Sequence, residues 1–165
     1  MDVIQRRVPI SRGERWASGR ARWHDVRYEG AEAAGPAPGV IEALEAADAI
    51  LLAPSNPYLS IGPILAVRAV REAIANRGVR CVAVSPVSGG RAFSGPLDRM
   101  LSRMAGGTTP RQVADRYRGL IDVLVIDEAD ATAKADVELV VTTTRMHDRE
   151  SERRLADVAL EAACT

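Results

Sequence analysis

Two segments of the sequence combine hydroxyl, amide and glycine residues in the manner of a phosphate or nucleotide site. The first, PSNPYLSIG, covers residues 54–62, and the second, SPVSGGRAFSGP, covers residues 85–96. Such residues, placed between a strand and a helix, bring backbone N–H groups and helix N-termini close to an anion. Neither segment has the spacing of a Walker A or a GxGxxG motif. The chemistry indicated is therefore non-covalent binding of an anion.

Each segment also has a purely structural interpretation. In the first, two prolines bracket Ser55 and Asn56, and Ser60 and Gly62 open the next helix, so the segment could be a rigid turn with a helix cap. The second could be a flexible glycine-rich connection. Residue types alone do not separate these interpretations from ligand binding.

A third group consists of acids that follow a predicted strand. Asp127, Glu128 and Asp130 come directly after residues 122–126, and carboxylates beside phosphate are the usual partners of Mg²⁺. Acids here could equally begin a helix, because the helix dipole favours negative charge at its start. Both interpretations stay open, and Asp127 and Asp130 are the candidate metal ligands. With no GxSxG motif and no nucleophile paired with a nearby histidine, nothing indicates covalent catalysis.

Alternating strands and helices position these residues. Continuous apolar runs predict buried strands at 49–53, 79–84, 122–126 and 138–142, and a short strand is predicted at 23–29. Prolines near helix starts and apolar residues at helical spacing predict helices at 36–47, 61–76, 96–104, 109–117 and 149–163. Such βαβ units form a parallel sheet with helices on both faces. In that fold ligands bind at the carboxyl ends of the strands, where all three polar groups fall.

The bulk composition is that of one globular α/β domain. The chain has 165 residues, of which 47% are hydrophobic and 27% charged, and its 22 basic side chains balance 22 acidic ones. This balance gives no net field that would attract nucleic acid or an anionic membrane. No apolar run reaches the ~20 residues of a membrane-spanning helix. Because only two cysteines occur, there is no disulfide framework, and we expect a cytoplasmic protein.

Residues 1–22 differ from the rest of the chain. They contain six arginines against two acids and show no apolar period. A nucleic-acid-binding arm and a frayed domain edge both account for this composition, and we adopt the second interpretation. No nucleic acid is therefore expected as a partner.

Five ordered segments resemble the 2-phospho-L-lactate transferase family, which acts in the biosynthesis of the deazaflavin coenzyme F-420. They are RYEGAEAAGPAPGVIEAL (27–44), APSNPYLSIGPILAV (53–67), VAVSPVSGGRAFSGPLDRML (82–101), YRGLIDVLVIDEADA (117–131) and VVTTTRMHDRESERRLA (140–156). The resemblance extends from Arg27 to Ala163. It covers only the C-terminal half of family members, and residues 1–22 match that family poorly.

The resemblance implies a three-layer, mostly parallel Rossmann-like sheet with helices on both faces, truncated at its N-terminus. Residues 23–165 then correspond to the C-terminal half of the transferase domain. The other half of family members holds a glycine-rich first loop and the carboxylates that contact deazaflavin and metal. The function implied is transfer of a phospho-three-carbon-acid group from lactyl- or enolpyruvyl-diphosphoguanosine to the 7,8-didemethyl-8-hydroxy-5-deazariboflavin precursor. GMP is released, and Mg²⁺ and N–H groups stabilise the developing charge.

Carried over residue by residue, the resemblance makes the two polar segments the donor site. The expected nucleotide- and donor-binding residues are Ser55, Asn56, Ser60, Gly62, Ser85, Ser88, Gly89, Gly90, Asp98 and Arg99. Asp98 and Arg99, from the GPLDRM segment, could instead pair on a helix face. No catalytic residue is assigned.

Two alternatives stay open. The related gluconeogenesis-factor family shares the fold, so the chain could be a non-catalytic nucleotide-sugar-binding regulator, although the second loop of that family differs from SPVSGG. The chain could also be an inactive fragment, because half of a sheet exposes an apolar edge. A homodimer, or a separate N-terminal half, would cover such an edge.

Overall fold

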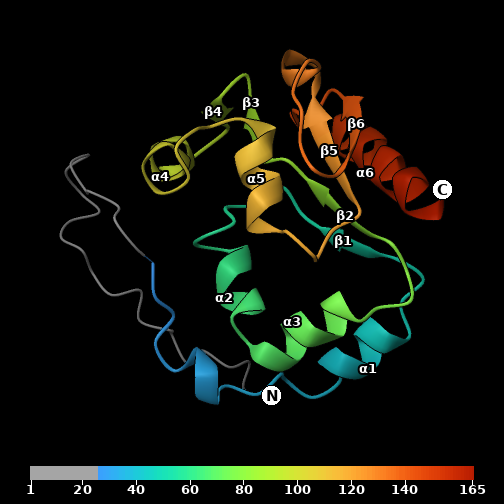
Figure 1. Ribbon diagram of the computed structural model, residues 1–165. Coiled ribbons are helices and arrows are strands. Elements are labelled where there is room, and N and C mark those ends of the chain that lie inside the picture. Colours follow the sequence, from blue (N-terminus) through green and yellow to red (C-terminus); the bar gives the residue numbers. More distant parts are fainter. Residues whose placement is uncertain (1–25) are drawn as a thin grey trace.

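Four short apolar strands form one parallel sheet in the computed structural model, which describes residues 26–165 (Figure 1). They are β1 (Ile50–Leu52), β2 (Cys81–Val84), β5 (Val123–Asp127) and β6 (Glu138–Thr142), in the order β1-β2-β5-β6. Every residue of β2 and β5 is buried, which accounts for their continuous apolar sequence. The four predicted strands and their parallel pairing are confirmed, but the edge strands are less buried than expected: Leu51 in β1 is exposed, and no residue of β6 is fully buried.

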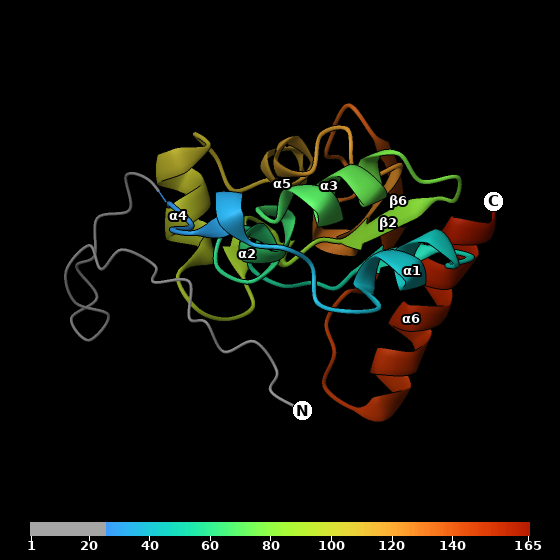
Figure 2. The ribbon, with the colours of Figure 1, turned by 90° about the horizontal axis from the view of Figure 1, so that it is seen from below.

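Helices cover both faces of this sheet. They are α1 (Val40–Glu45), α2 (Ile61–Leu65), α3 (Arg68–Ala75), α4 (Leu97–Met104), α5 (Pro110–Arg116) and α6 (Arg149–Cys164), with short 3-10 helices η1 (Ala31–Ala33) and η2 (Glu128–Asp130). Alternate strand residues face separate cores: Ala83 and Leu124 pack with the helices before β5, and Val82 and Val123 pack with α6. Figure 2 shows α6 on the side of the sheet opposite α3 and α5. The predicted three-layer arrangement is confirmed.

Local sequence signals explain where two of these helices begin. The side chain of Gln112 accepts a hydrogen bond from the backbone N–H of Thr109 (3.0 Å), directly before Pro110 at the start of α5. At the start of α6, the Asp148 carboxylate accepts a hydrogen bond from the backbone N–H of Ser151 (2.8 Å). Both are capping arrangements that satisfy backbone groups left unpaired in the first turn.

Three predicted elements differ from the structure. The helix expected at 36–47 is only six residues long, because the chain is not helical before Gly39 (φ 84°) and α1 begins at Val40. The single helix expected at 61–76 is divided into α2 and α3, because Val67 has an extended backbone (φ −73°, ψ 107°) and packs against the core. The strand expected at 23–29 is absent from its described part, residues 26–29, where only Tyr28 forms an isolated bridge. There the chain turns at Gly30 (φ 77°) directly into η1. Residues 1–22 lie outside the described residues.

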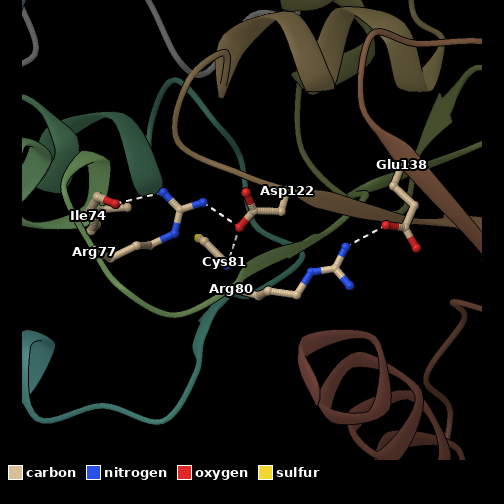
Figure 3. Close-up of polar contacts among 6 residues, drawn as sticks. All are labelled: Ile74, Arg77, Arg80, Cys81, Asp122 and Glu138. Carbon is tan, nitrogen blue, oxygen red and sulfur yellow. Dashed lines mark hydrogen bonds and ion pairs between the residues drawn. The ribbon is translucent and has the colours of Figure 1, made fainter. Parts of the chain in front are cut away.

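A mostly buried arginine joins the amino ends of β2 and β5 (Figure 3). Asp122 accepts hydrogen bonds from the backbone N–H of Cys81 (2.8 Å) and from the Arg77 guanidinium (2.5 Å). Arg77, whose side chain is 9% exposed, also donates to the carbonyl of Ile74 near the end of α3 (2.7 Å). Partial burial raises the pKa of Asp122, but the bonds from Cys81 and Arg77 outweigh it, so the net pKa is lowered. The carboxylate therefore stays ionised and tied to α3 and β2.

Cys81 itself is fully buried within β2. Burial raises the pKa of its thiol to about 11, so the side chain is a neutral, small apolar residue of the core. In residues 26–165, no helix combines the length and the apolar character that crossing a bilayer requires.

We expect Asp122→Asn to lower the free energy of unfolding by about 1–2 kcal/mol at neutral pH. It removes the charge partner of a mostly buried arginine, but the loss is smaller than for a fully buried pair because the Asp122 side chain is 42% exposed. Since folding lowers the pKa of Asp122, this contribution holds above about pH 4 and is lost as the pH falls further. Urea unfolding at neutral pH and near pH 3 measures both effects.

The matched control is Glu138→Gln, which breaks the more exposed Arg80–Glu138 pair at the same end of the sheet (Figure 3). We expect it to cost less than about 1 kcal/mol. Equal losses in the two variants at neutral pH would contradict the structural role of Asp122.

Candidate functional site

The carboxyl ends of the parallel strands meet at one edge of the sheet, and each leads into a polar loop. β1 is followed by the PSNPYLSIG segment, β2 by the SPVSGGRAFSGP segment, β5 by Glu128–Asp130, and β6 by residues 143–148. Because β2 lies between β1 and β5, three of the loops are neighbours in space. This is the edge at which open α/β sheets bind ligands.

The second polar segment forms a small antiparallel hairpin. Its strands are β3 (Val87–Ser88) and β4 (Arg91–Ala92), joined by Gly89 and Gly90. Both glycines have positive φ, 55° and 74°, as a two-residue hairpin turn of this kind requires. The segment therefore contains a defined two-residue turn between two short paired strands. Strands of two residues are too short to show an alternating pattern in the sequence.

Asp127, the last residue of β5, connects three of the loops. Its Oδ1 accepts hydrogen bonds from the Ser88 hydroxyl (2.7 Å) and the Ala129 N–H (3.1 Å). Its Oδ2 accepts from the N–H and the hydroxyl of Thr144, both at 2.9 Å. Asp127 is only 8% exposed; burial raises its pKa, but the four hydrogen bonds outweigh it and the net pKa is lowered. An ionised carboxylate thus fixes the hairpin and the loop after β6.

Asp130 makes a second contact to the hairpin. Its Oδ2 accepts a hydrogen bond from the N–H of Gly89 (3.0 Å). Burial, together with the nearby charge of Asp127, raises the pKa of Asp130 above its ordinary value despite that bond. Residues 26–165 contain no group of three or more His, Cys, Asp or Glu side chains that could hold a metal ion. Since both oxygens of Asp127 already accept hydrogen bonds, Asp130 is the more available of the two candidate metal ligands.

Asn56 shapes the first polar segment. Its Oδ1 accepts hydrogen bonds from the N–H groups of Tyr58 (2.9 Å) and Leu59 (3.1 Å), and its backbone carbonyl accepts from Ser60 (2.9 Å). Its amide nitrogen faces the sulfur of Met100 in α4 (3.7 Å). Ser60 is exposed and Ser55 is half-buried at this loop. The side chain of Asn56 therefore maintains the turn that presents these two serines.

Gly62 lies under a tyrosine that sequence analysis did not single out. A Cβ on Gly62 would overlap the Tyr28 hydroxyl and come within 2.8 Å of the Pro57 carbonyl. The Tyr28 hydroxyl donates to the carbonyl of Tyr58 (2.6 Å), and the Arg116 guanidinium lies 4.7 Å from the centre of the Tyr58 ring. Close packing therefore accounts for the glycine at this position. The hydrogen bond that holds Tyr28 there joins it to Tyr58, 30 positions away, so no local sequence pattern indicates this packing.

The remaining expected residues are placed in different ways. Ser85 is fully buried, and its hydroxyl donates to the carbonyl of Val87 (3.1 Å). Asp98 and Arg99 lie on α4 beside the buried Leu97 and Met100, and the Asp98 carboxylate accepts from the backbone N–H of Arg99 (2.8 Å). The structure brings Ser88 and Gly89 together with Asp127 and Asp130. Ligand binding by the ten expected residues stays a prediction.

Thr144 and the arginine after it were not among the expected site residues. Thr144 is buried against Asp127, and the Arg145 guanidinium lies 5.7 Å from the centre of the exposed Phe93 ring, in the loop after β4. These contacts join the end of β6 to the hairpin segment. Only the strand-end position of the TTTR sequence could have indicated them.

Comparison with known proteins shows the family of the chain. The family model described as 2-phospho-L-lactate transferase CofD matches residues 3–162. A 2-phospho-L-lactate transferase from Methanothermobacter thermautotrophicus is 38% identical over 141 residues, covering 82% of this chain and 44% of the relative. A phosphoenolpyruvate transferase from Streptomyces griseus is 43% identical over 140 residues, covering 81% of this chain and 44% of the relative.

The chain thus spans less than half the length of these relatives, and both relatives are named as transferases. The family match nevertheless includes both polar segments, Asp127 and the whole sheet, and it begins at residue 3, within the segment 1–22 that we expected to match poorly. The chain belongs to the 2-phospho-L-lactate transferase CofD family.

Proposed function

We propose that this chain carries the donor-binding part of a transferase of coenzyme F-420 biosynthesis. The group transferred is a phosphorylated three-carbon acid, which passes from a guanylylated donor to the deazaflavin precursor with release of GMP. The observation that carries the proposal is Asp127, which holds the hairpin, η2 and the loop after β6 together at the carboxyl edge of the sheet. Family membership supports the choice of reaction.

The proposal names a class of donor, guanylylated three-carbon acids, and does not choose one acid within that class. The relative from Methanothermobacter is named for 2-phospho-L-lactate, and the relative from Streptomyces is named for phosphoenolpyruvate. Both acids have three carbons, a carboxylate and a phosphate. We therefore propose lactyl- and enolpyruvyl-diphosphoguanosine as the candidate donors.

The role of these residues is to bind and orient the donor. Transfer of this kind depends on positioning and on stabilisation of charge at the phosphoryl oxygens. Gly90, which carries no side chain, lets the hairpin backbone approach a phosphate closely, and Ser55 and Ser60 offer hydroxyl groups from the neighbouring loop. Asp127 acts through Ser88 and Thr144 as a positioning residue.

Mg²⁺ is part of the proposal as a partner of the phosphates. It usually keeps several waters and takes one or two carboxylates together with substrate phosphates. The described residues fit that arrangement through Asp130, whose Oδ2 alone is engaged, by Gly89. When bound, the ion would neutralise charge on the phosphate oxygens.

We expect the chain to bind GDP in the presence of Mg²⁺ in calorimetric titration, and to bind UDP-N-acetylglucosamine far more weakly. Asn56→Ala should weaken GDP binding by about tenfold or more, because it removes the acceptor of two N–H groups that shape the first loop.

Thr132→Ala, an exposed change beyond η2, is the control and should bind GDP as the wild-type chain does. Preference for the UDP-sugar would assign the chain to the nucleotide-sugar-binding regulators. Wild-type affinity in Asn56→Ala would contradict the placement of the donor.

We expect Asp127→Asn to destabilise the fold by about 1–3 kcal/mol and to weaken GDP binding. An amide has one acceptor oxygen where the carboxylate has two, so a buried donor of Ser88 or Thr144 loses its partner. Because folding lowers the pKa of Asp127, the difference from wild type should be full above about pH 4 and shrink on further acidification. Urea unfolding gives the stability, and hydrogen exchange of residues 85–92 reports the hairpin.

The control for this change is Asp136→Asn, an exposed acid between η2 and β6, which should change stability by less than about 0.5 kcal/mol. If Asp127→Asn exchanged its hairpin amides at the wild-type rate, Asp127 would not be what holds the hairpin.

We expect Mg²⁺ to increase GDP affinity in the wild-type chain, and Asp130→Asn to abolish most of that increase. The variant keeps an oxygen that can accept from Gly89, so the hairpin contact is retained while the charge is lost. Titrations with and without Mg²⁺ measure the effect, and Asp136→Asn, an exposed acid between η2 and β6, is the control. An unchanged Mg²⁺ effect in Asp130→Asn would place the ion on other ligands.

A further inference from the structure

An open groove separates the tip of the β3–β4 hairpin from the outer face of α4. Its volume is about 460 Å³. The residues that line it come from the hairpin, from α4 and from the loop before α5: Gly90, Arg91, Asp98, Arg99, Ser102, Arg103 and Thr108. Three of the seven are arginines and one is an acid, so the lining carries a net positive charge although the chain as a whole is neutral.

The fold directs these arginines toward the groove. In α4, Leu97, Met100 and Leu101 are buried in the core, so Arg99 and Arg103, four positions apart, share the opposite, exposed face. Arg91 follows the glycine turn on β4 and is also exposed. Two separate elements therefore bring guanidinium groups to one groove.

Internal ion pairs do not account for two of these arginines. Within the described part of the chain, the side chains of Arg91 and Arg103 form no hydrogen bond or ion pair. By contrast, Arg68 and Arg153 each pair with an acid four positions later, Glu72 and Asp157. Like charges at this spacing, as at Arg99 and Arg103, destabilise a helix slightly. The arrangement therefore suits an external anion.

We propose that this groove binds the diphosphate group of a nucleotide, with Arg91 and Arg103 as ligands beside Arg99. Guanidinium groups pair with phosphate oxygens through two parallel hydrogen bonds. The hydroxyls of Ser102 and Thr108 add two further donors at the rim. Gly90 (φ 74°) lets the turn pack close to Thr108, since a Cβ at this position would lie only 3.1 Å from the Thr108 hydroxyl. The inference rests on the proposed function, in which this diphosphate belongs to the guanylylated donor.

The test compares the Arg91→Gln/Arg103→Gln double variant with the wild-type chain. Inorganic pyrophosphate and GDP are titrated separately by calorimetry at low ionic strength, because screening by salt weakens exposed charge pairs. We expect the double variant to bind both ligands at least about tenfold more weakly, since each arginine contributes a charge-assisted hydrogen bond. Arg68→Gln/Arg153→Gln, which removes the same charge from α3 and α6, is the control and should bind as wild type.

The outcomes separate this inference from the proposed function. Pyrophosphate binding that is lost in the double variant, with no GDP binding by any chain, would support a diphosphate site in the groove but contradict both its assignment to a nucleotide and the proposed function. GDP binding that is lost in Asn56→Ala but unchanged in the arginine double variant would support the proposed function and overturn the groove. Failure of the wild-type chain to bind pyrophosphate, or equal loss in the control, would also overturn the groove.

Discussion

The buried carboxylate of Asp127 is the interaction on which the carboxyl edge of the sheet depends. Burying an ionised group is costly unless hydrogen bonds replace the water that it loses. Here four donors do so, and they come from the hairpin, from η2 and from the loop after β6. The hydrogen bonds that keep Asp127 charged thus also fix the relative positions of three loops. Displacing any one of them would leave part of a buried charge without a partner.

At the opposite end of the sheet, the amino ends of β2 and β5 are held by an ion pair. There Arg77 and Asp122 form an ion pair that also holds the end of α3 and the first N–H of β2. Between the two ends, β2 and β5 contribute only apolar residues until Asp127. The amino end therefore serves stability, and the polar groups gathered at the carboxyl end are those that could meet a ligand. This division is common to open parallel sheets, because their loops after the strands face the ligand crevice.

Much of the fold could be predicted because its strands carry continuous apolar runs, although only β2 and β5 are buried along their whole length. The apolar runs at 122–126 and 138–142 locate β5 and β6 to within a residue, and the capping residues Thr109 and Asp148 mark the starts of α5 and α6. The break at Val67 could not be predicted, since an extended valine between two helical segments depends on core packing. At the candidate site, the sequence indicated which loops lie at the carboxyl edge of the sheet, but not the separate roles of the residues within them. Ser85 and Gly62 serve packing because of Val87 and Tyr28, which are contacts that only tertiary structure creates.

The local distribution of charge on the folded chain cannot be inferred from its composition. Equal numbers of acidic and basic side chains give no net field that would attract nucleic acid or an anionic membrane. In the folded chain, Arg77, Arg80 and Arg118 are paired with acids, whereas Arg91 and Arg103 share a groove whose one acid is Asp98. Pairing elsewhere thus leaves a local excess of positive charge beside the hairpin while the net charge stays zero. A neutral chain can therefore attract a small, highly charged ligand over a few ångströms and still have no long-range attraction for nucleic acid, since exposed charges are screened beyond about 8–10 Å.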